Sequence, residues 1–222
     1  MRSAARINLC FHGIGMPQRA LEPGEQPYWL SKELFTQILE YVGGRENVAL
    51  SFDDGNASDV EIALPELTRR GLRASFFPIA SRIGESGSID AIGLRRLLNS
   101  GMTVGSHGMN HVRWRGLRGP GLDEELVVAR AIIEREAGAP ITAAACPFGV
   151  YDRRALSRLR ALSYAQVFTS DRAPAHRGWW LQPRFSLRQT DTLAEVRQIV
   201  EQTLAPKERM LHLARIAAKR WR

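Results

Sequence analysis

The amino-acid sequence predicts a single-domain α/β fold in which about six or seven parallel strands form a sheet that is closed, or nearly closed, into a barrel. Three observations support this fold class. The chain has 222 residues, enough for one substantial core, and 44% of them are hydrophobic. Short apolar runs alternate with segments of helical periodicity almost without exception. Polar and ionisable residues gather just after the apolar runs, where α/β barrels carry their functional loops.

The first part of the chain contains two strand and helix units. An apolar run at 7–11 predicts the first strand, and a loop rich in Pro and Gly follows at 16–26. Ser31 provides a helix start, and apolar residues continue at helical spacing to Val42, where two glycines end the helix. The run 48–52 predicts the second strand, and a helix is expected from 57 or 58 to Arg70.

The rest of the chain repeats this alternation up to a basic end. Strands are expected at 74–79, 103–105, 143–147 and 166–169, and helices at 89–100, 122–136, 153–162 and 193–204. In residues 206–222, Lys and Arg punctuate an apolar helical pattern. We therefore expect one domain at 1–205 and a basic C-terminal helix at 206–222. This helix could rest on an anionic glycan or membrane surface, or pack as a terminal helix.

Composition excludes several classes of protein. The 31 Lys and Arg against 23 Asp and Glu give a net charge of +8, but arginine is dispersed and no basic motif is interleaved with aromatics, so no nucleic-acid partner is expected. Cys10 and Cys146 are expected to be buried thiols rather than a disulfide. No run approaches the length of a membrane span, and residues 1–10 lack the apolar stretch of a signal peptide. A cytoplasmic location is expected, with membrane association open.

Two segments that follow predicted strands carry the side chains of a metal site. They are SFDDG at 51–55 and VGSHGMNH at 104–111. Carboxylate and imidazole groups hold zinc and related ions, and three protein ligands leave a position for water. Asp54, His107 and His111 could be these ligands, which would leave Asp53 to act as a base. The alternatives are a surface Asp-Asp-Gly turn, an exposed histidine pair, or an Fe(II) oxygenase site, which also uses two histidines and one carboxylate.

Together these segments resemble the polysaccharide deacetylase family, also called the NodB-homology group or carbohydrate esterase family 4. Residues 51–55 match its [TS]-F-D-D-G motif, residues 107–111 match its H-x-x-x-H motif, and ASFF at 74–77 is similar to its A-T-F-F strand. The resemblance covers about residues 7–185 and identifies 1–205 as a NodB-homology domain. It implies a distorted (β/α) barrel with a divalent metal, usually zinc, with cobalt or nickel as alternatives. It also implies that Asp53 is the catalytic base and that Asp54, His107 and His111 are the metal ligands.

The chain departs from the family pattern at two motifs. The third motif is commonly R-x-P-[FY], in which the Arg orients the base, but the segment 145–148 is ACPF. Arg184, in QPRF at 182–185, is the candidate substitute, although an ordinary loop arginine fits the sequence equally well. The late L-x-x-H motif, whose His serves as the acid, is not clearly present. His12, which leaves the first strand on the catalytic side, is instead predicted to be the acid or a substrate contact.

Further residues at the expected rim are predicted to contact substrate. These are Phe148, Gly149 and Tyr151, and a backbone amide beside Phe148 or Gly149 could help to hold an oxyanion. Trp180, next to Trp179, could stack against a sugar ring, although packing at one end of the barrel is the alternative for this pair.

The resemblance implies a hydrolase that acts on carbon–nitrogen bonds other than peptide bonds. We expect it to remove acetyl groups, N-acetyl groups first, from an acetylated sugar, polysaccharide or glycoconjugate in surface or extracellular polysaccharide biosynthesis. The alternative is a catalytically weak or inactive deacetylase-like domain that binds glycan, and the missing third-motif Arg motivates it.

Overall fold

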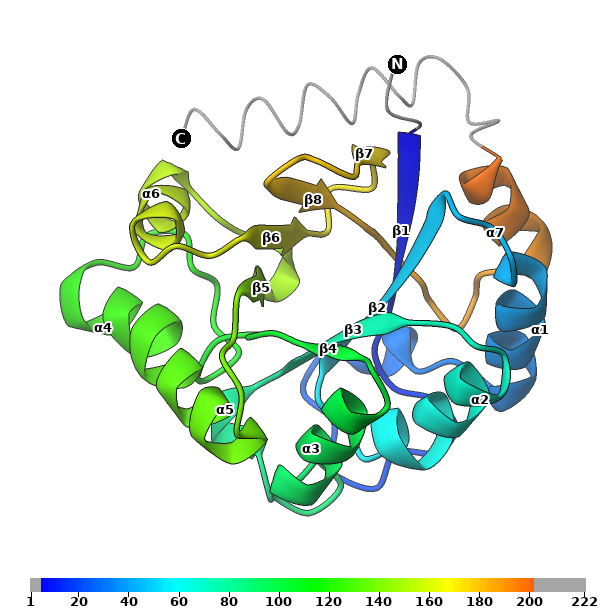
Figure 1. Ribbon diagram of the computed structural model, residues 1–222, viewed down its shortest axis with the longest axis horizontal. Coiled ribbons are helices and arrows are strands. Elements are labelled where there is room, and N and C mark those ends of the chain that lie inside the picture. Colours follow the sequence, from blue (N-terminus) through cyan, green and yellow to red (C-terminus); the bar gives the residue numbers. More distant parts are fainter. Residues whose placement is uncertain (1–4, 202–222) are drawn as a thin grey trace.

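The computed structural model describes residues 5–201, which form a mixed α/β fold (Figure 1). The larger sheet has the strand order β4-β3-β2-β1-β7, with β9 also paired to β1, and the smaller sheet has the order β5-β6-β8. The strands are β1 (Ala5–Phe11), β2 (Val48–Asp54), β3 (Ala74–Pro78), β4 (Thr103–Val104), β5 (Ala143–Ala145), β6 (Gln166–Thr169), β7 (Ala175–His176), β8 (Leu181–Pro183) and β9 (Phe185–Ser186).

The two sheets meet at two places. Ser106, just beyond β4, forms a parallel bridge with Ala144 of β5. On the other side only Arg184 separates β8, which pairs with β6, from β9, which pairs with β1. The parallel strands therefore follow one another around the circuit of a barrel, which confirms the predicted fold class. The antiparallel pairing of β7 with β1 was not predicted.

Helices surround the strands on the right, lower and left sides of Figure 1. The longer ones lie near their predicted positions, and the predicted helices 58–70 and 122–136 each contain one π-helical turn. The α-helices are α1 (Lys32–Val42), α2 (Leu64–Arg69), α3 (Ala91–Asn99), α4 (Gly119–Asp123), α5 (Ala129–Ala137), α6 (Arg153–Ala161) and α7 (Leu193–Val200). The π-helical turns are η2 (Asp59–Ala63) and η4 (Glu124–Val128), and the 3₁₀ turns are η1 (Gln26–Tyr28), η3 (Ala80–Arg82) and η5 (Pro147–Gly149).

Side-chain caps define where four of these helices begin. Ser31 Oγ accepts a hydrogen bond from the Leu34 amide at 3.1 Å, as the predicted start of α1 requires. Asp90 and Asp152 cap α3 and α6 in the same way, and Thr192 forms a reciprocal capping box with Glu195 at α7. Each cap satisfies an amide that the first helical turn leaves without a partner.

The main core lies between the larger sheet and helices α1, α2, α3, α5 and α7. Its centre is a group of phenylalanines on three adjacent strands and α1. Phe52 of β2 stacks on Phe11 at 5.1 Å and on Phe76 at 4.6 Å between ring centroids, and Phe35 of α1 packs edge-on against Phe11. This packing fixes the end of β2, where the two adjacent carboxylates lie.

Two further expectations can be compared with the structure, and a third cannot. Cys10 and Cys146 are buried free thiols, as predicted. Within residues 5–201, no helix is long and apolar enough to cross a membrane. The predicted basic helix at 206–222 lies outside the described residues.

Truncating the central phenylalanine tests the packing of this core. Phe52→Ala is expected to lower the free energy of unfolding by about 3–5 kcal/mol, because a fully buried ring is replaced by a cavity. Urea denaturation followed by circular dichroism measures this change. Ile92→Ala, at a side chain that is 64% exposed, serves as the control and is expected to change stability by less than about 0.5 kcal/mol. Equal effects of the two substitutions would contradict the assigned core.

Candidate active site

The candidate site lies at the carboxyl ends of the parallel strands, on the side where such barrels carry their functional loops. Asp53 and Asp54 end β2, His12 directly follows β1, and His107 follows β4. Asp53, Asp54 and His107 are all at most 2% exposed. The structure thus brings together side chains that lie on different strand and helix units of the sequence.

Asp54, His107 and His111 form a compact triad, with their potential ligand atoms all within 4.8 Å of one another. Asp54 Oδ1 lies 3.6 Å from His107 Nε2 and 3.5 Å from His111 Nε2. This oxygen is buried and has no hydrogen-bond partner among the residues that the structure describes. A buried carboxylate oxygen that lacks a partner is costly unless something else satisfies it, so the triad suits a divalent cation.

Both imidazoles are oriented by contacts on their far nitrogen. His107 Nδ1 donates to the Ala145 carbonyl at 2.9 Å, and His111 Nδ1 lies 2.6 Å from Glu22 Oε2. A proton on Nδ1 leaves the lone pair on Nε2, which faces Asp54 in both residues. Burial lowers the pKa of His107 to about 4, although Asp53 and Asp54 oppose this shift, so its imidazole is neutral and able to bind a metal.

The ligand atoms of the triad fit the divalent metal that the sequence predicted. Two imidazole nitrogens and one carboxylate oxygen suit zinc, cobalt, nickel and ferrous iron. A second cluster, Cys10 with His12 and Asp53, is a weaker candidate among the described residues. Burial raises the pKa of the Cys10 thiol far above its usual value, which keeps it protonated and unsuited to bind a metal.

The backbone around Asp54 has an uncommon conformation. Asp54 has φ +74° and Gly55 has φ +71°, and His111 has φ +52°. A Cβ atom at position 55 would lie 2.8 Å from Pro78 Cβ, so only glycine fits this close turn. Non-glycine residues with positive φ are uncommon and gather at functional sites.

Asp53 forms a buried ion pair with Arg184. Two hydrogen bonds of 2.6 Å join the guanidinium to Oδ1 and Oδ2. The same guanidinium donates to Ser51 Oγ at 3.1 Å and to the Thr169 carbonyl at 3.3 Å. Burial alone would raise the pKa of Asp53, but Arg184, aided by His107, outweighs this effect and holds the pKa well below its usual value. Asp53 is therefore ionised.

The cavity over these residues has a volume of about 140 Å³ and combines residues from loops far apart in the sequence. His12 lines this cavity, and its buried Nδ1 atom has no hydrogen-bond partner in the described part of the chain. The centroid of its ring lies 4.8 Å from that of Tyr28. The lining residues are His12, Glu22, Pro23, Gly24, Glu25, Tyr28, Asp53, Asp54, His107, His111, Phe148, Ser170 and Ser186. Sequence reasoning missed seven of these residues because no motif or periodicity marked their loops. They are Glu22, Pro23, Gly24, Glu25, Tyr28, Ser170 and Ser186.

The predicted substrate contacts occupy different places. Phe148 lines the cavity, is 52% exposed and stacks on His111 with 4.3 Å between ring centroids. Gly149 does not line the cavity, and its amide donates to the Cys146 carbonyl at 2.9 Å. Tyr151 is buried, with its hydroxyl donating to Asp171 at 2.9 Å, and it too lies outside the cavity lining.

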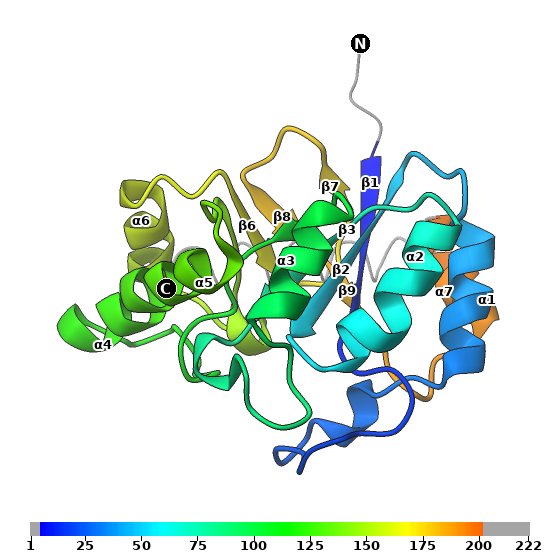
Figure 2. The ribbon, with the colours of Figure 1, turned by 60° about the horizontal axis from the view of Figure 1, so that its bottom comes forward.

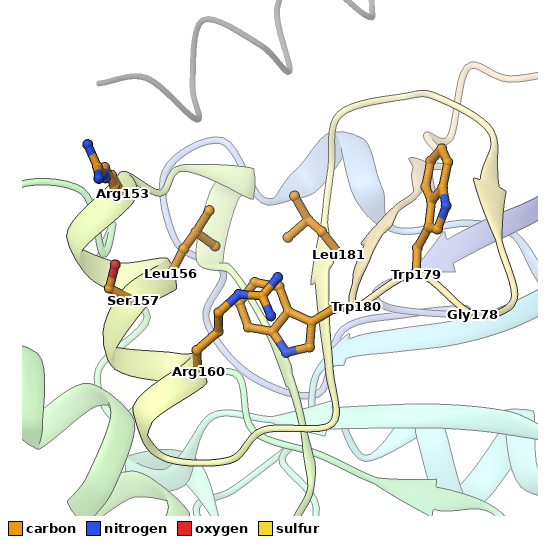
Figure 3. A pocket seen from close by; sticks show the side chains of 8 residues that line it. All are labelled: Arg153, Leu156, Ser157, Arg160, Gly178, Trp179, Trp180 and Leu181. Carbon is orange, nitrogen blue, oxygen red and sulfur yellow. The ribbon is translucent and has the colours of Figure 1, made fainter.

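Trp180 lies in a separate groove between α6 and the segment that leads into β8 (Figure 3). Arg160 lies over its ring, 4.0 Å from the ring centroid. Trp180 precedes the amino end of β8, whereas Asp53 and Asp54 lie at the carboxyl end of β2. The structure therefore does not bring Trp180 together with the cavity residues.

The chain is similar to known proteins in both sequence and fold. The family described as polysaccharide deacetylase matches residues 41–167, more than half of the chain. YxkH of Bacillus subtilis, whose name assigns it provisionally to the polysaccharide deacetylases, is 23% identical over 130 residues, or 59% of this chain and 47% of YxkH. The chain thus spans about half the length of this curated relative.

Several solved structures share the fold. The deacetylase PplD of Streptococcus pyogenes superposes with a TM-score of 0.77 at 17% identity, covering 89% of this chain and 99% of PplD. The polysaccharide deacetylase BC0361 of Bacillus cereus superposes with a TM-score of 0.76 at 17% identity, and the match covers 89% of this chain and 69% of BC0361. IcaB of Ammonifex degensii superposes with a TM-score of 0.69 at 22% identity, and the match covers 90% of this chain and 97% of IcaB. On the match of its sequence to the family, this chain belongs to the polysaccharide deacetylases.

Proposed function

We propose that this chain is a metal-dependent hydrolase that removes acetyl groups, N-acetyl groups in particular, from a glycan or glycoconjugate. The observation that carries the proposal is the compact triad of Asp54, His107 and His111 beside an ionised Asp53. The structurally similar PplD was solved in complex with acetate, which is the product that this reaction releases. The family also supports a polysaccharide substrate, and we place the reaction in surface or extracellular polysaccharide biosynthesis.

The proposed chemistry assigns separate tasks to the adjacent carboxylates. Asp54, with His107 and His111, would hold the divalent ion, for which zinc is our first choice and cobalt or nickel the alternatives. Such an ion supplies an acidified water and polarises the acetyl carbonyl. Asp53 would take the proton of the attacking water, and the distance of 3.8 Å between its Oδ2 atom and His107 Nε2 supports this role because it brings the carboxylate close to the proposed ion site. Arg184 holds that carboxylate in one orientation and keeps it ionised.

His12 is the proposed proton donor to the leaving group. Water adds to the carbonyl carbon, the carbon–nitrogen bond breaks, acetate leaves and the amine needs a proton. His12 lines the same cavity as Asp53, and its Nδ1 atom has no hydrogen-bond partner within residues 5–201. Phe148 and Tyr28 form apolar walls suited to a sugar ring. Trp180 would contact a sugar ring only if the glycan were long enough to reach the separate groove.

Acetate release is the direct test of this function. Purified protein is stripped of metal, reloaded with zinc, cobalt or nickel, and incubated with acetylated chitooligosaccharides and acetylated bacterial glycans. We expect release that depends on the metal and proceeds without oxygen. Binding of acetylated glycan by the metal-loaded protein without acetate release would instead indicate a glycan-binding domain, and a reaction that requires oxygen would indicate an iron oxygenase.

Two substitutions separate the base from the ligands. Asp53→Asn is expected to lower turnover by about 10²–10⁴-fold, because the proton acceptor is lost while the triad remains. His107→Ala is expected to lower both turnover and bound metal, because one ligand is removed. Acetate release and metal content per chain are measured on variants whose circular dichroism matches the wild type. Asp123→Asn, at a partly exposed carboxylate paired with Arg158, is the control. Equal metal loss in Asp53→Asn and His107→Ala would contradict the division of roles.

A double-mutant cycle tests the buried ion pair. Arg184→Gln is expected to lower the free energy of unfolding of the metal-free protein by about 3–5 kcal/mol, because it leaves the Asp53 charge buried without its partner. The combined Asp53→Asn and Arg184→Gln variant should lose less stability than the sum of the two single variants, since neither charge is then left alone. Urea denaturation measures all four proteins, with Arg135→Gln at an exposed position as the control. Additive losses would show that the two side chains do not act as a pair.

A further inference from the structure

The loop between β1 and α1 covers the candidate site and is held at both ends. The Gly15 amide donates to the Leu30 carbonyl at 2.8 Å, and the Leu30 amide donates to the Gly13 carbonyl at 2.9 Å. We call residues 15–30 the site loop. In Figure 2 it is part of the blue segment beyond the lower end of β1, the end at which the parallel strands present their functional residues. Five residues of the site loop line the cavity, which are Glu22, Pro23, Gly24, Glu25 and Tyr28.

Charged side chains fix the middle of the site loop. Arg19 and Glu25 form a buried ion pair within it, and Arg19 also donates to Asn56 Oδ1 at 2.7 Å. Glu22 contacts residues outside the site loop. One of its carboxylate oxygens pairs with Arg82 of η3, and the other lies 2.6 Å from His111 Nδ1. The site loop therefore contacts one residue of the metal triad directly.

The two imidazoles of the triad are supported in different ways. His107 donates to the backbone carbonyl of Ala145, which belongs to β5 and is fully buried. His111 depends on Glu22, whose side chain is 40% exposed and lies 89 positions away in the sequence. A carboxylate is a stronger acceptor than a carbonyl, and such a partner orients the ring and raises the basicity of its ligating nitrogen.

We propose that Glu22 is a positioning residue for His111, so that the metal affinity of the triad and the seating of the site loop depend on one another. The inference rests on the metal centre of the proposed function. Arg82 contributes through Glu22, because it holds the second carboxylate oxygen and fixes the direction of the first. By linkage, a contact that strengthens metal binding is itself strengthened by the metal to the same extent.

The test measures zinc affinity by competition with a chromophoric chelator at neutral pH, which needs no substrate. Glu22→Gln is expected to weaken zinc binding by about 10–100-fold, the usual effect of losing a partner that orients a ligating histidine. Arg82→Gln should weaken it less, and it should add nothing in the Glu22→Gln background. The matched control is Glu61→Gln, because Glu61 also holds the site loop, through Gln18 at 2.6 Å, but contacts no histidine of the triad.

Amide hydrogen exchange provides a second readout. Zinc should slow exchange in residues 19–25 of the wild type and of Glu61→Gln, but not in Glu22→Gln. Thermal unfolding of the metal-free proteins should be the same for Glu22→Gln and Glu61→Gln, which separates positioning of the ligand from general support of the loop.

The outcomes distinguish this inference from the proposed function. Equal zinc affinities of Glu22→Gln and Glu61→Gln would overturn the role of Glu22 while leaving the metal centre in place. A wild-type chain that binds no divalent ion would overturn the metal centre and this inference with it. Weaker zinc binding in Glu22→Gln alone supports the inference, even where no acetate is released from the glycans tried.

Discussion

The buried ion pair between Asp53 and Arg184 is the interaction on which the site depends. The two residues are 131 positions apart, and they join the end of β2 to the junction of β8 and β9. Because an isolated buried charge costs several kcal/mol, neither side chain would be stable at its position without the other. Arg184 also donates to Ser51 and Thr169, so one guanidinium ties β2 and β6 to the last parallel strands. The same contacts link the two sheets and keep a carboxylate ionised at the floor of the cavity.

Local pattern was sufficient to predict the parallel core and the position of the triad. Strand β2 is apolar for most of its length and ends in two aspartates, and α1 begins at a serine that caps it. Parallel strands direct their carboxyl ends to one edge, so residues that follow β1, β2 and β4 had to lie near one another. Arg184 could be named as a candidate because the third motif lacks its arginine. Its pairing with Asp53 depends on how β8 and β9 join the sheets, which the local sequence does not encode.

The remaining parts of the site depend on contacts that no local pattern marks. Glu22 lies in a segment rich in Pro and Gly without periodicity, and its contact with His111 exists only in the folded chain. Strands β7, β8 and β9 have two or three residues each, too few to show alternation. Because β8 was not anticipated, Trp180 could not be assigned to its amino end, away from the cavity. Tyr151 was expected at the rim, but its ring packs in a separate buried cluster with Trp114 and Leu159, and its hydroxyl donates to Asp171.

The adjacent aspartates show how backbone conformation separates two chemical tasks. Consecutive residues of a regular strand point to opposite faces, so Asp53 and Asp54 would diverge if β2 continued unchanged. The positive φ values of Asp54 and Gly55 turn the chain at this point, and both carboxylates line one cavity. Both residues stay in register with β3, Asp53 opposite Phe77 and Asp54 opposite Pro78. The Asp53 carboxylate pairs with Arg184, whereas the Asp54 carboxylate faces the two imidazoles. The two adjacent carboxylates therefore face different partners, which are a guanidinium for Asp53 and two imidazoles for Asp54.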